Sequence, residues 1–204
     1  MQPDIICFGE PLLEFNQNPE DGKYLAGHGG DTSNAACSAA RQGARVGYFT
    51  ALGADTFGDS FVELWINEGI DSSRVLRNNR AHTGIYFVTH GSEGHQFTYF
   101  RAGSAASLIT PEDVPEDYIS QGKILHVSGI SQAISDSACD AVFHAIDLAH
   151  KHGLRVSYDT NLRLKLWPLE RAKAVIHSAM AKCDIALPGL EDAVQLTGCT
   201  DPEK

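Results

Sequence analysis

Three stretches of the 204-residue chain combine polar side chains with spacings that could serve a reaction. The first runs from Gly27 to Asn34 (GHGGDTSN) and leads directly into an alanine-rich segment. Glycines let a backbone approach a ligand closely, and a helix N-terminus offers free N–H groups to hydroxyl or anionic groups. A tight turn before a helix is the plain alternative. The stretch is not a dinucleotide-binding loop, because Thr32 stands where the third glycine belongs, and the chain has no G-x-x-x-x-G-K-[ST] loop.

The second stretch, Asp159-Thr-Asn161-Leu-Arg163, follows a short apolar run at 154–158. If that run is a parallel strand, its carboxyl end lies where open α/β sheets bind their ligands. Asp159, Asn161 and Arg163 stand at alternating positions and could present three polar groups to one crevice. A polar loop that caps the next helix is the alternative interpretation.

The third stretch is Phe97-Thr-Tyr99-Phe-Arg101, followed by AGSAAS up to Ser107. Tyr99 and Arg101 are two residues apart, so on a strand their side chains point to the same side. An arginine can bind a carboxylate through two charge-assisted hydrogen bonds. A solvated strand face is the alternative for such a pair.

The composition excludes several classes of partner. The formal net charge is -10, and an acidic surface repels nucleic acid and anionic lipid, so neither is an expected partner. The five cysteines are scattered without a C-x-x-C pair, and the nine histidines show no ligand spacing, so we expect no disulfide framework and no structural metal. The N-terminus lacks the basic and apolar regions of a signal peptide, which predicts a cytoplasmic location.

Strand and helix patterns alternate along the chain, and these elements must position the three stretches. Strands are expected at 5–8, 45–52, 123–127, 154–158 and 184–187. Helices are expected at 33–42, 55–68, 137–152, 169–182 and 190–196. The alternation predicts a parallel sheet with helices on both faces. We expect Asp31, Thr32 or Ser33 to cap the first helix.

Two segments break this alternation. Residues 12–26 and 83–101 are typical of extended, hairpin-forming strands, and 90–94 (HGSEG) supplies the turn of the second. Strands inserted in this way often form a small separate sheet that can cover a substrate. We therefore expect one incomplete α/β domain over 1–204 with such a lid, ending soon after a last βα unit and leaving an open sheet edge.

These motifs together resemble the ribokinase/PfkB carbohydrate kinases. The resemblance rests on Gly29-Gly30-x-x-x-Asn34, on Gly43, Gly53 and Gly58, and on the run GEPLLE at 9–14, and it extends over essentially the whole chain. It implies a ribokinase-like three-layer, Rossmann-like α/β fold with a small β-sheet lid and a missing C-terminal part. It also implies ATP and Mg2+ as cofactors, a small-molecule sugar or sugar acid as substrate, and a homo-oligomer joined through the lids.

The resemblance also gives individual residues expected roles. The expected substrate-binding residues are Glu14, Gly30, Asn34, Tyr86, Tyr99, Arg101 and Arg163. The expected ATP-binding residues are Asn161, Leu162, Arg163 and Glu191. Glu191 occupies the acidic position of the family's N-x-x-E motif, but Pro188 replaces the Asn. A surface glutamate at the start of a helix is therefore the alternative for Glu191.

Within the family, the pattern favours the 2-keto-3-deoxygluconate kinases. Fructokinases more often carry an acidic residue where this chain has Ser107, and Gly-Gly-Asp-Thr at 29–32 points the same way. The sugar acid also carries a carboxylate that suits Arg101 and that fructose lacks. A fructokinase or another sugar kinase of the same fold is the near alternative, and a non-catalytic sugar-acid-binding protein is the far one.

The implied reaction transfers the γ-phosphoryl group of ATP to a terminal sugar hydroxyl. The family's catalytic base is the Asp of a G-A-G-D motif, and these 204 residues contain no such motif. We therefore expect no catalytic residue in this chain, and we expect the base and most of the adenine pocket to follow residue 204. This chain is expected to supply the sugar half of the site.

Overall fold

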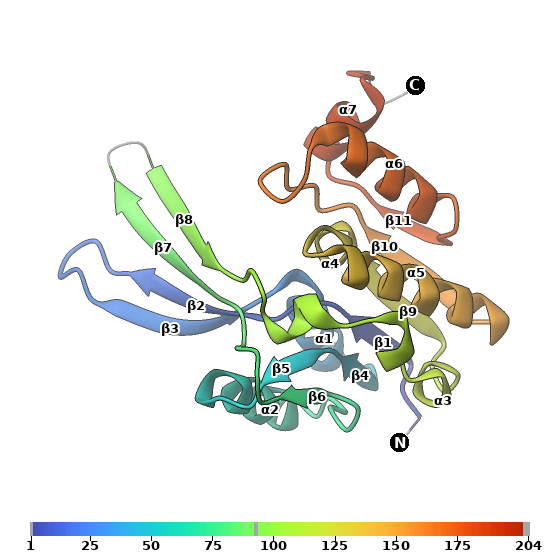
Figure 1. The fold of residues 1–204 in the computed structure, drawn as a ribbon, viewed down its shortest axis with the longest axis horizontal. Helices are drawn as coiled ribbons and strands as arrows, with labels where there is room; N and C mark the ends of the chain where they lie inside the picture. The colour runs from blue at the N-terminus through green and yellow to red at the C-terminus, as the bar shows by residue number, and fades with distance from the viewer. Residues whose placement is uncertain (1, 92–93, 202–204) are drawn as a thin grey trace.

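The computed structural model describes residues 2–91 and 94–201, and a parallel five-stranded sheet forms its centre (Figure 1). The strand order is β11-β10-β9-β1-β4, and every pair is parallel. The strands are β1 (Ile5–Phe8), β4 (Val46–Phe49), β9 (Ile124–Ser128), β10 (Arg155–Asp159) and β11 (Ile185–Leu187). Their runs are largely apolar, as strands covered on both faces require. Three of them fall within the predicted segments, and β9 and β10 each end one residue beyond theirs.

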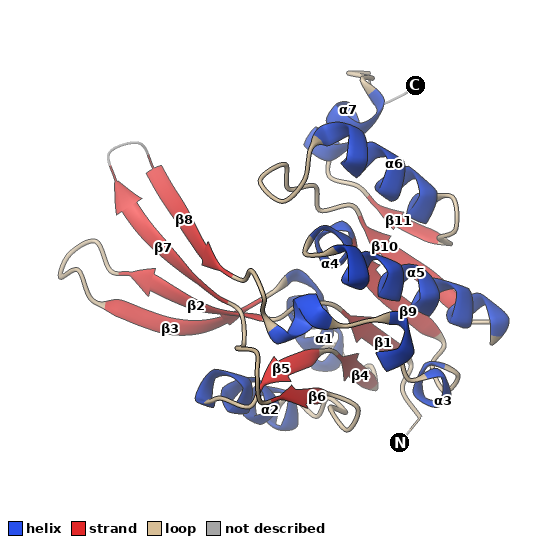
Figure 2. Cartoon of the chain, in the orientation of Figure 1, coloured by secondary structure: helices blue, strands red, loops and turns tan. Residues whose placement is uncertain are grey.

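Helices cover both faces of this sheet (Figure 2). The longer helices are α1 (Asp31–Arg41), α2 (Thr56–Asn67), α5 (Asp136–Lys151), α6 (Leu169–Met180) and α7 (Leu190–Thr197). Shorter helical turns are α3 (Glu116–Ile119), α4 (Gly129–Ala133), η1 (Ala105–Leu108) and η2 (Pro111–Asp113). One apolar cluster packs α5 and α6 against the sheet, and a second packs α1 and α2 against the other face. This layering confirms the predicted fold class. Within the described residues, no helix has the length and apolar character needed to cross a membrane.

The predicted strand at 45–52 is two strands in the structure. β4 belongs to the central sheet, whereas β5 (Ala51–Gly53) pairs with β6 (Leu76–Asn78) in a separate two-stranded sheet. The chain changes sheets at Thr50, whose carbonyl accepts a hydrogen bond from the N–H of Leu76 at 2.9 Å. The apolar run continues across the change because both strands are buried, so hydrophobicity alone could not mark it.

The predicted side-chain cap of α1 is wrong. The N-cap is Gly30, and no side chain caps the helix. The three expected capping residues are engaged elsewhere: Asp31 accepts a hydrogen bond from Asn161, Thr32 shares one with Tyr48, and Ser33 accepts one from Trp65. These partners lie far away in sequence, which is why a local capping rule missed them.

The two inserted segments form one four-stranded sheet, in the order β3-β2-β7-β8, that projects from the central sheet (Figure 1). Its strands are β2 (Leu12–Gln17), β3 (Tyr24–Gly29), β7 (Ile85–Gly91) and β8 (Gly94–Phe100). The small sheet predicted over 12–26 and 83–101 is therefore present, and we call it the lid sheet. Gly91 pairs with Gly94, while residues 92 and 93 of the predicted turn lie outside the described residues.

Candidate functional site

A cleft of about 670 Å³ lies between the lid sheet and the carboxyl ends of the central strands. It is lined by eight of the residues that the sequence singled out: Gly30, Asn34, Tyr86, Tyr99, Arg101, Asn161, Leu162 and Arg163. They come from α1, from the lid strands β7 and β8, and from the loop after β10. The fold thus brings the three chemically promising stretches to one place, although Asp31 and Asn161, for example, are 130 residues apart in sequence.

The lid contributes an aromatic wall to this cleft. Tyr86 and Tyr99 are register partners on β7 and β8, with ring centroids 5.5 Å apart, and Phe97 stacks on Tyr99 at 6.3 Å. The Tyr86 hydroxyl donates a hydrogen bond to the carboxylate of Glu14 on β2. Burial raises the pKa of Tyr86, and Glu14 raises it further, so this hydroxyl remains a donor.

Glu14 itself does not line the cleft. It lines a neighbouring hollow on the lid sheet and reaches the cleft only through Tyr86. Its carboxylate also accepts a hydrogen bond from the Asn16 side chain at 3.3 Å. The structure therefore places Glu14 as a support for Tyr86, and direct substrate contact by Glu14 stays a prediction.

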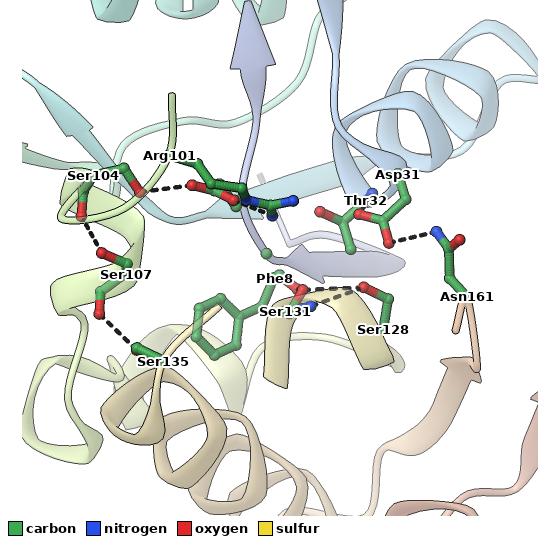
Figure 3. Close-up of polar contacts among 12 residues, drawn as sticks. Phe8, Asp31, Thr32, Arg101, Ser104, Ser107, Ser128, Ser131, Ser135 and Asn161 are labelled. Carbon is green, nitrogen blue, oxygen red and sulfur yellow. Dashed lines mark hydrogen bonds and ion pairs between the residues drawn. The ribbon is translucent and has the colours of Figure 1, made fainter. Parts of the chain in front are cut away.

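Arg101 lies at the base of the lid in a buried ion pair (Figure 3). Its guanidinium group donates to the carboxylate of Glu10, which is 0% exposed, while the Arg101 side chain is 11% exposed. The Ser104 hydroxyl donates to the same carboxylate at 2.6 Å. Burial raises the pKa of Glu10, and the Arg101 charge and the Ser104 hydrogen bond oppose that rise. The Tyr99 ring lies 5.7 Å from the guanidinium carbon, so the two side chains lie together as predicted, although Arg101 follows the last residue of β8.

One donor of Arg101 has no partner. The Nε atom of Arg101 is buried and makes no hydrogen bond in the structure. An unsatisfied buried donor costs about 1–3 kcal/mol, and a donor on a charged group costs more. The Arg101 side chain lines the cleft, and its guanidinium group is suited to bind an anion there.

Gly30 brings the start of α1 close to the end of β1. Its φ is +102°, and a Cβ atom there would lie 2.6 Å from the Glu10 carbonyl oxygen and 2.8 Å from the Pro11 Cα. The glycine is therefore needed for backbone packing, which is the turn interpretation that the sequence left open. Gly30 and the exposed Asn34 both line the cleft, and their contact with a sugar stays a prediction.

The loop after β10 is held in an unusual conformation at Asn161, whose φ is +32°. The Asn161 side chain donates to Asp31 at 2.9 Å and so ties this loop to the start of α1 (Figure 3). Its backbone N–H donates to Asp159 at 3.2 Å. Asp159 does not line the cleft, and burial raises its pKa, with Asp31 adding to the rise. The three alternating polar residues thus have different tasks, and Asp159 supports the loop.

The two ATP-site predictions beside Asn161 have different environments. Arg163 is exposed in the cleft, and it donates to the carbonyl of Leu162 at 2.9 Å. The Leu162 side chain is buried, and its N–H donates to Asp192 at 2.9 Å. Asp192 also accepts a hydrogen bond from Thr160 at 2.8 Å, so it fixes the whole loop.

Glu191, the residue before Asp192, lies exposed in the first turn of α7 and does not line the cleft. Both its position and its exposure fit the alternative of a helix-start glutamate. A contact between Glu191 and ATP stays a prediction. In this segment, Asp192 is the acidic residue whose side chain accepts hydrogen bonds from the loop after β10.

Sequence reasoning missed three charged residues that line the cleft: Glu10, Asp31 and Lys165. Glu10 stands two residues after β1, and its position at a carboxyl strand end was the available signal. The described residues contain no group of three or more His, Cys, Asp or Glu side chains able to hold a metal ion. Mg2+ usually takes only one or two protein carboxylates beside the phosphates of its substrate, so Mg2+ as a cofactor stays a prediction.

Comparisons with known proteins give the family of this chain. The model of the pfkB family carbohydrate kinases matches residues 2–204. This chain belongs to that family. Among solved structures, the PfkB chain resembles the PfkB protein from Polaromonas sp. JS666 with a TM-score of 0.92 and 32% identity, over 98% of this chain and 70% of that one. It also resembles a fructokinase with bound ATP from Xylella fastidiosa, with a TM-score of 0.84 and 26% identity, over 91% of this chain and 57% of that one.

Curated relatives of this PfkB chain have two activities. The chain is 34% identical to the 2-dehydro-3-deoxygluconokinase of Bacillus subtilis (strain 168), over 100% of this chain and 65% of that relative. It is 33% identical to the enzyme of the same name from Thermoproteus tenax, over 98% and 63%. It is 29% identical to the probable fructokinase-5 of Arabidopsis thaliana, over 99% and 71%. The chain thus spans about 65% of the first relative's length, and sugar acids and fructose are both substrates among its relatives.

Proposed function

We propose that the gene product carrying this chain phosphorylates a sugar acid, 2-keto-3-deoxygluconate, with ATP to give 2-keto-3-deoxy-6-phosphogluconate. The observation that carries the proposal is that two guanidinium groups, those of Arg101 and Arg163, line one cleft. A substrate carboxylate is a charged acceptor for a guanidinium group, and a neutral sugar supplies only a weaker one. Identities of 34% and 33% to two 2-dehydro-3-deoxygluconokinases support the same choice.

The residues of this chain bind and orient the sugar acid in this proposal. Arg101 binds the carboxylate, with the Tyr99 hydroxyl beside it. Asn34 and the backbone at Gly30 contact sugar hydroxyls, and the Tyr86 ring covers the sugar from the lid. Together these groups would exclude water from the lid side of the cleft, which strengthens their charged interactions.

The nucleotide side is proposed from the loop after β10. Arg163, beside Asn161 and Leu162, neutralises charge on the transferred phosphoryl group, since phosphoryl transfer depends on positioning and charge neutralisation. ATP supplies the phosphoryl group, and Mg2+, when it accompanies ATP, neutralises phosphate charge. The carboxylate that accepts the sugar hydroxyl proton stays a prediction for a G-A-G-D motif beyond these residues.

A fructokinase is the second candidate. One observation favours it: the Arg101 charge is already balanced by Glu10, so the cleft does not offer a free cation at that point. Curated fructokinases of 29–32% identity are also among the relatives. A protein that binds sugar acids without phosphorylating them is the more distant candidate.

Steady-state kinetics of the full-length gene product separates these candidates. With saturating ATP, kcat/KM is measured for 2-keto-3-deoxygluconate and for fructose. The proposal expects the sugar acid to be preferred by at least about 10-fold, the lower bound for one hydrogen bond to a charged group. Equal or better use of fructose would favour a fructokinase, and binding of the sugar acid without phosphoryl transfer would favour the binding protein.

A further inference from the structure

The carboxylate of Glu10 joins the end of β1 to the loop that leaves the lid sheet. Glu10 follows β1 of the central sheet, whereas Arg101 and Ser104 lie on the loop between β8 of the lid sheet and η1. Both Glu10 oxygens are engaged, one by the Arg101 guanidinium and the other by the Ser104 hydroxyl at 2.6 Å. Figure 3 shows Arg101 and Ser104 next to each other along this loop. A fully buried carboxylate at this junction fixes the side chains that contact it.

The consequence for Arg101 follows from the shape of its guanidinium group. The group is planar, so a bond at one of its nitrogens sets the direction of the remaining N–H groups. Glu10 holds an NH2 nitrogen, and the Tyr99 ring lies 5.7 Å from the guanidinium carbon. The Nε–H is buried and makes no hydrogen bond, and the Arg101 side chain, 11% exposed, lines the cleft. Without Glu10, the flexible arginine side chain would lose its fixed orientation.

We infer that Glu10 is a positioning residue for substrate recognition: it holds Arg101 in the orientation that binds the sugar-acid carboxylate, and it balances the Arg101 charge while the cleft is empty. This inference rests on the proposed function. It assigns to Glu10 no contact with substrate. Through Arg101, however, Glu10 contributes to the preference for acidic over neutral sugars.

The test compares Glu10→Ala with Glu10→Gln in the full-length gene product, with KM measured for 2-keto-3-deoxygluconate and for fructose. Alanine removes the anchor of Arg101. Glutamine keeps it, because its Oε1 can accept from Arg101 while its Nε2 donates to the Ser104 hydroxyl, which can turn to accept. We expect Glu10→Ala to raise KM for the sugar acid at least about 10-fold more than KM for fructose. We expect Glu10→Gln to restore most of that difference.

A purely structural role gives a different pattern. Loss of fold stability would raise KM for both sugars by the same factor or lower the amount of active enzyme, and equal factors would overturn the inference. If Glu10→Ala does not fold, Glu10→Asp replaces it, because its carboxylate is withdrawn by one methylene. An Asp variant with an unchanged ratio of the two KM values would also overturn the inference.

The wild-type measurement keeps the two ideas apart. A wild-type enzyme that does not prefer the sugar acid contradicts the proposed function, and the inference fails with it. A wild-type enzyme that prefers the sugar acid, together with Glu10 variants that lose both sugars equally, contradicts the inference alone. Circular dichroism of each variant shows whether the fold is kept.

Discussion

Replacing Arg101 by methionine should destabilise the protein far more than replacing an ordinary surface arginine. Methionine keeps much of the apolar stem but removes the charge that balances Glu10. The Glu10 carboxylate is 0% exposed, so it would be left buried without a cation. Removing one partner of a buried ion pair costs about 3–5 kcal/mol, mainly because the remaining charge stays desolvated.

The second replacement tests that explanation. In the double variant Glu10→Gln with Arg101→Met, no charge remains at the junction, and the glutamine can still bond to the Ser104 hydroxyl. The glutamine amide that replaces the Glu10 carboxylate is then only partly hydrogen-bonded, which lowers the free energy of unfolding by about 1–3 kcal/mol. The double variant should therefore be more stable than Arg101→Met alone by about 2 kcal/mol, although it carries one more substitution.

The pH dependence has a defined sign. Burial already raises the pKa of Glu10 above its ordinary value of 4.5, and loss of Arg101 raises it further. A group whose pKa is raised by folding stabilises the protein when protonated, and that stability is lost as pH rises through the raised pKa. The stability gap between wild type and Arg101→Met should thus be small near pH 4.5 and widen as pH increases above it.

Urea denaturation followed by circular dichroism at several pH values measures these free energies of unfolding. Arg74→Met is the matched control, because the Arg74 and Asp117 side chains of that ion pair are 43% and 62% exposed. It should cost less than about 1 kcal/mol. The reasoning is refuted if Arg101→Met costs no more than this control, or if the double variant is less stable than the single one.

Three further predictions concern the cleft and the lid. Gly30→Ala should destabilise the protein by about 1–3 kcal/mol through its backbone conformation alone, and the 2.6 Å approach of the new Cβ to the Glu10 carbonyl oxygen adds to this cost. Gly91→Ala is the control, because a Cβ at Gly91 meets no atom within 4 Å, and it should leave the free energy of unfolding in urea nearly unchanged. Asp192→Ala removes two hydrogen bonds to the loop after β10 and should lower the free energy of unfolding by about 1–3 kcal/mol. Glu191→Ala should change the free energy of unfolding by less than about 0.5 kcal/mol. If Glu191 binds ATP, that variant should raise only KM for ATP. If the lid sheet joins two copies, Leu25→Glu, at a side chain 76% exposed, should yield monomers in analytical ultracentrifugation, and an unchanged mass would remove that interface.

The fold was predictable because its signals are periodic and local. The short, mainly apolar segments at 123–127 and 154–158 indicated buried parallel strands, and the two alternating segments indicated the lid. The change of sheet at Thr50 was not predictable, since the apolar run passes through it unbroken. Helix capping at α1 failed for a similar reason, because Asn161 takes the Asp31 carboxylate from 130 positions away.

In the candidate site, too, residue types could be selected from the sequence, whereas their long-range partners could not. Arg101 and Arg163 could be selected from residue type and spacing, and the structure places both in one cleft. Glu10 could not be assigned a partner, since Arg101 follows it by 91 residues. The choice between Glu191 and Asp192 was also beyond sequence, because it depends on which carboxylate faces Thr160 when α7 packs.

The central claim is that Arg101 recognises the carboxylate of a sugar acid. Its most direct test is kcat/KM of the Glu10→Gln with Arg101→Met variant, which carries no unbalanced buried charge, on 2-keto-3-deoxygluconate and on fructose. We expect a loss of about 10- to 150-fold on the sugar acid, the contribution of a hydrogen bond to a charged group, with a much smaller loss on fructose. Arg163→Ala, as the comparison, should lower both alike because both sugars receive the same phosphoryl group. Equal losses on the two sugars for the double variant would contradict the claim.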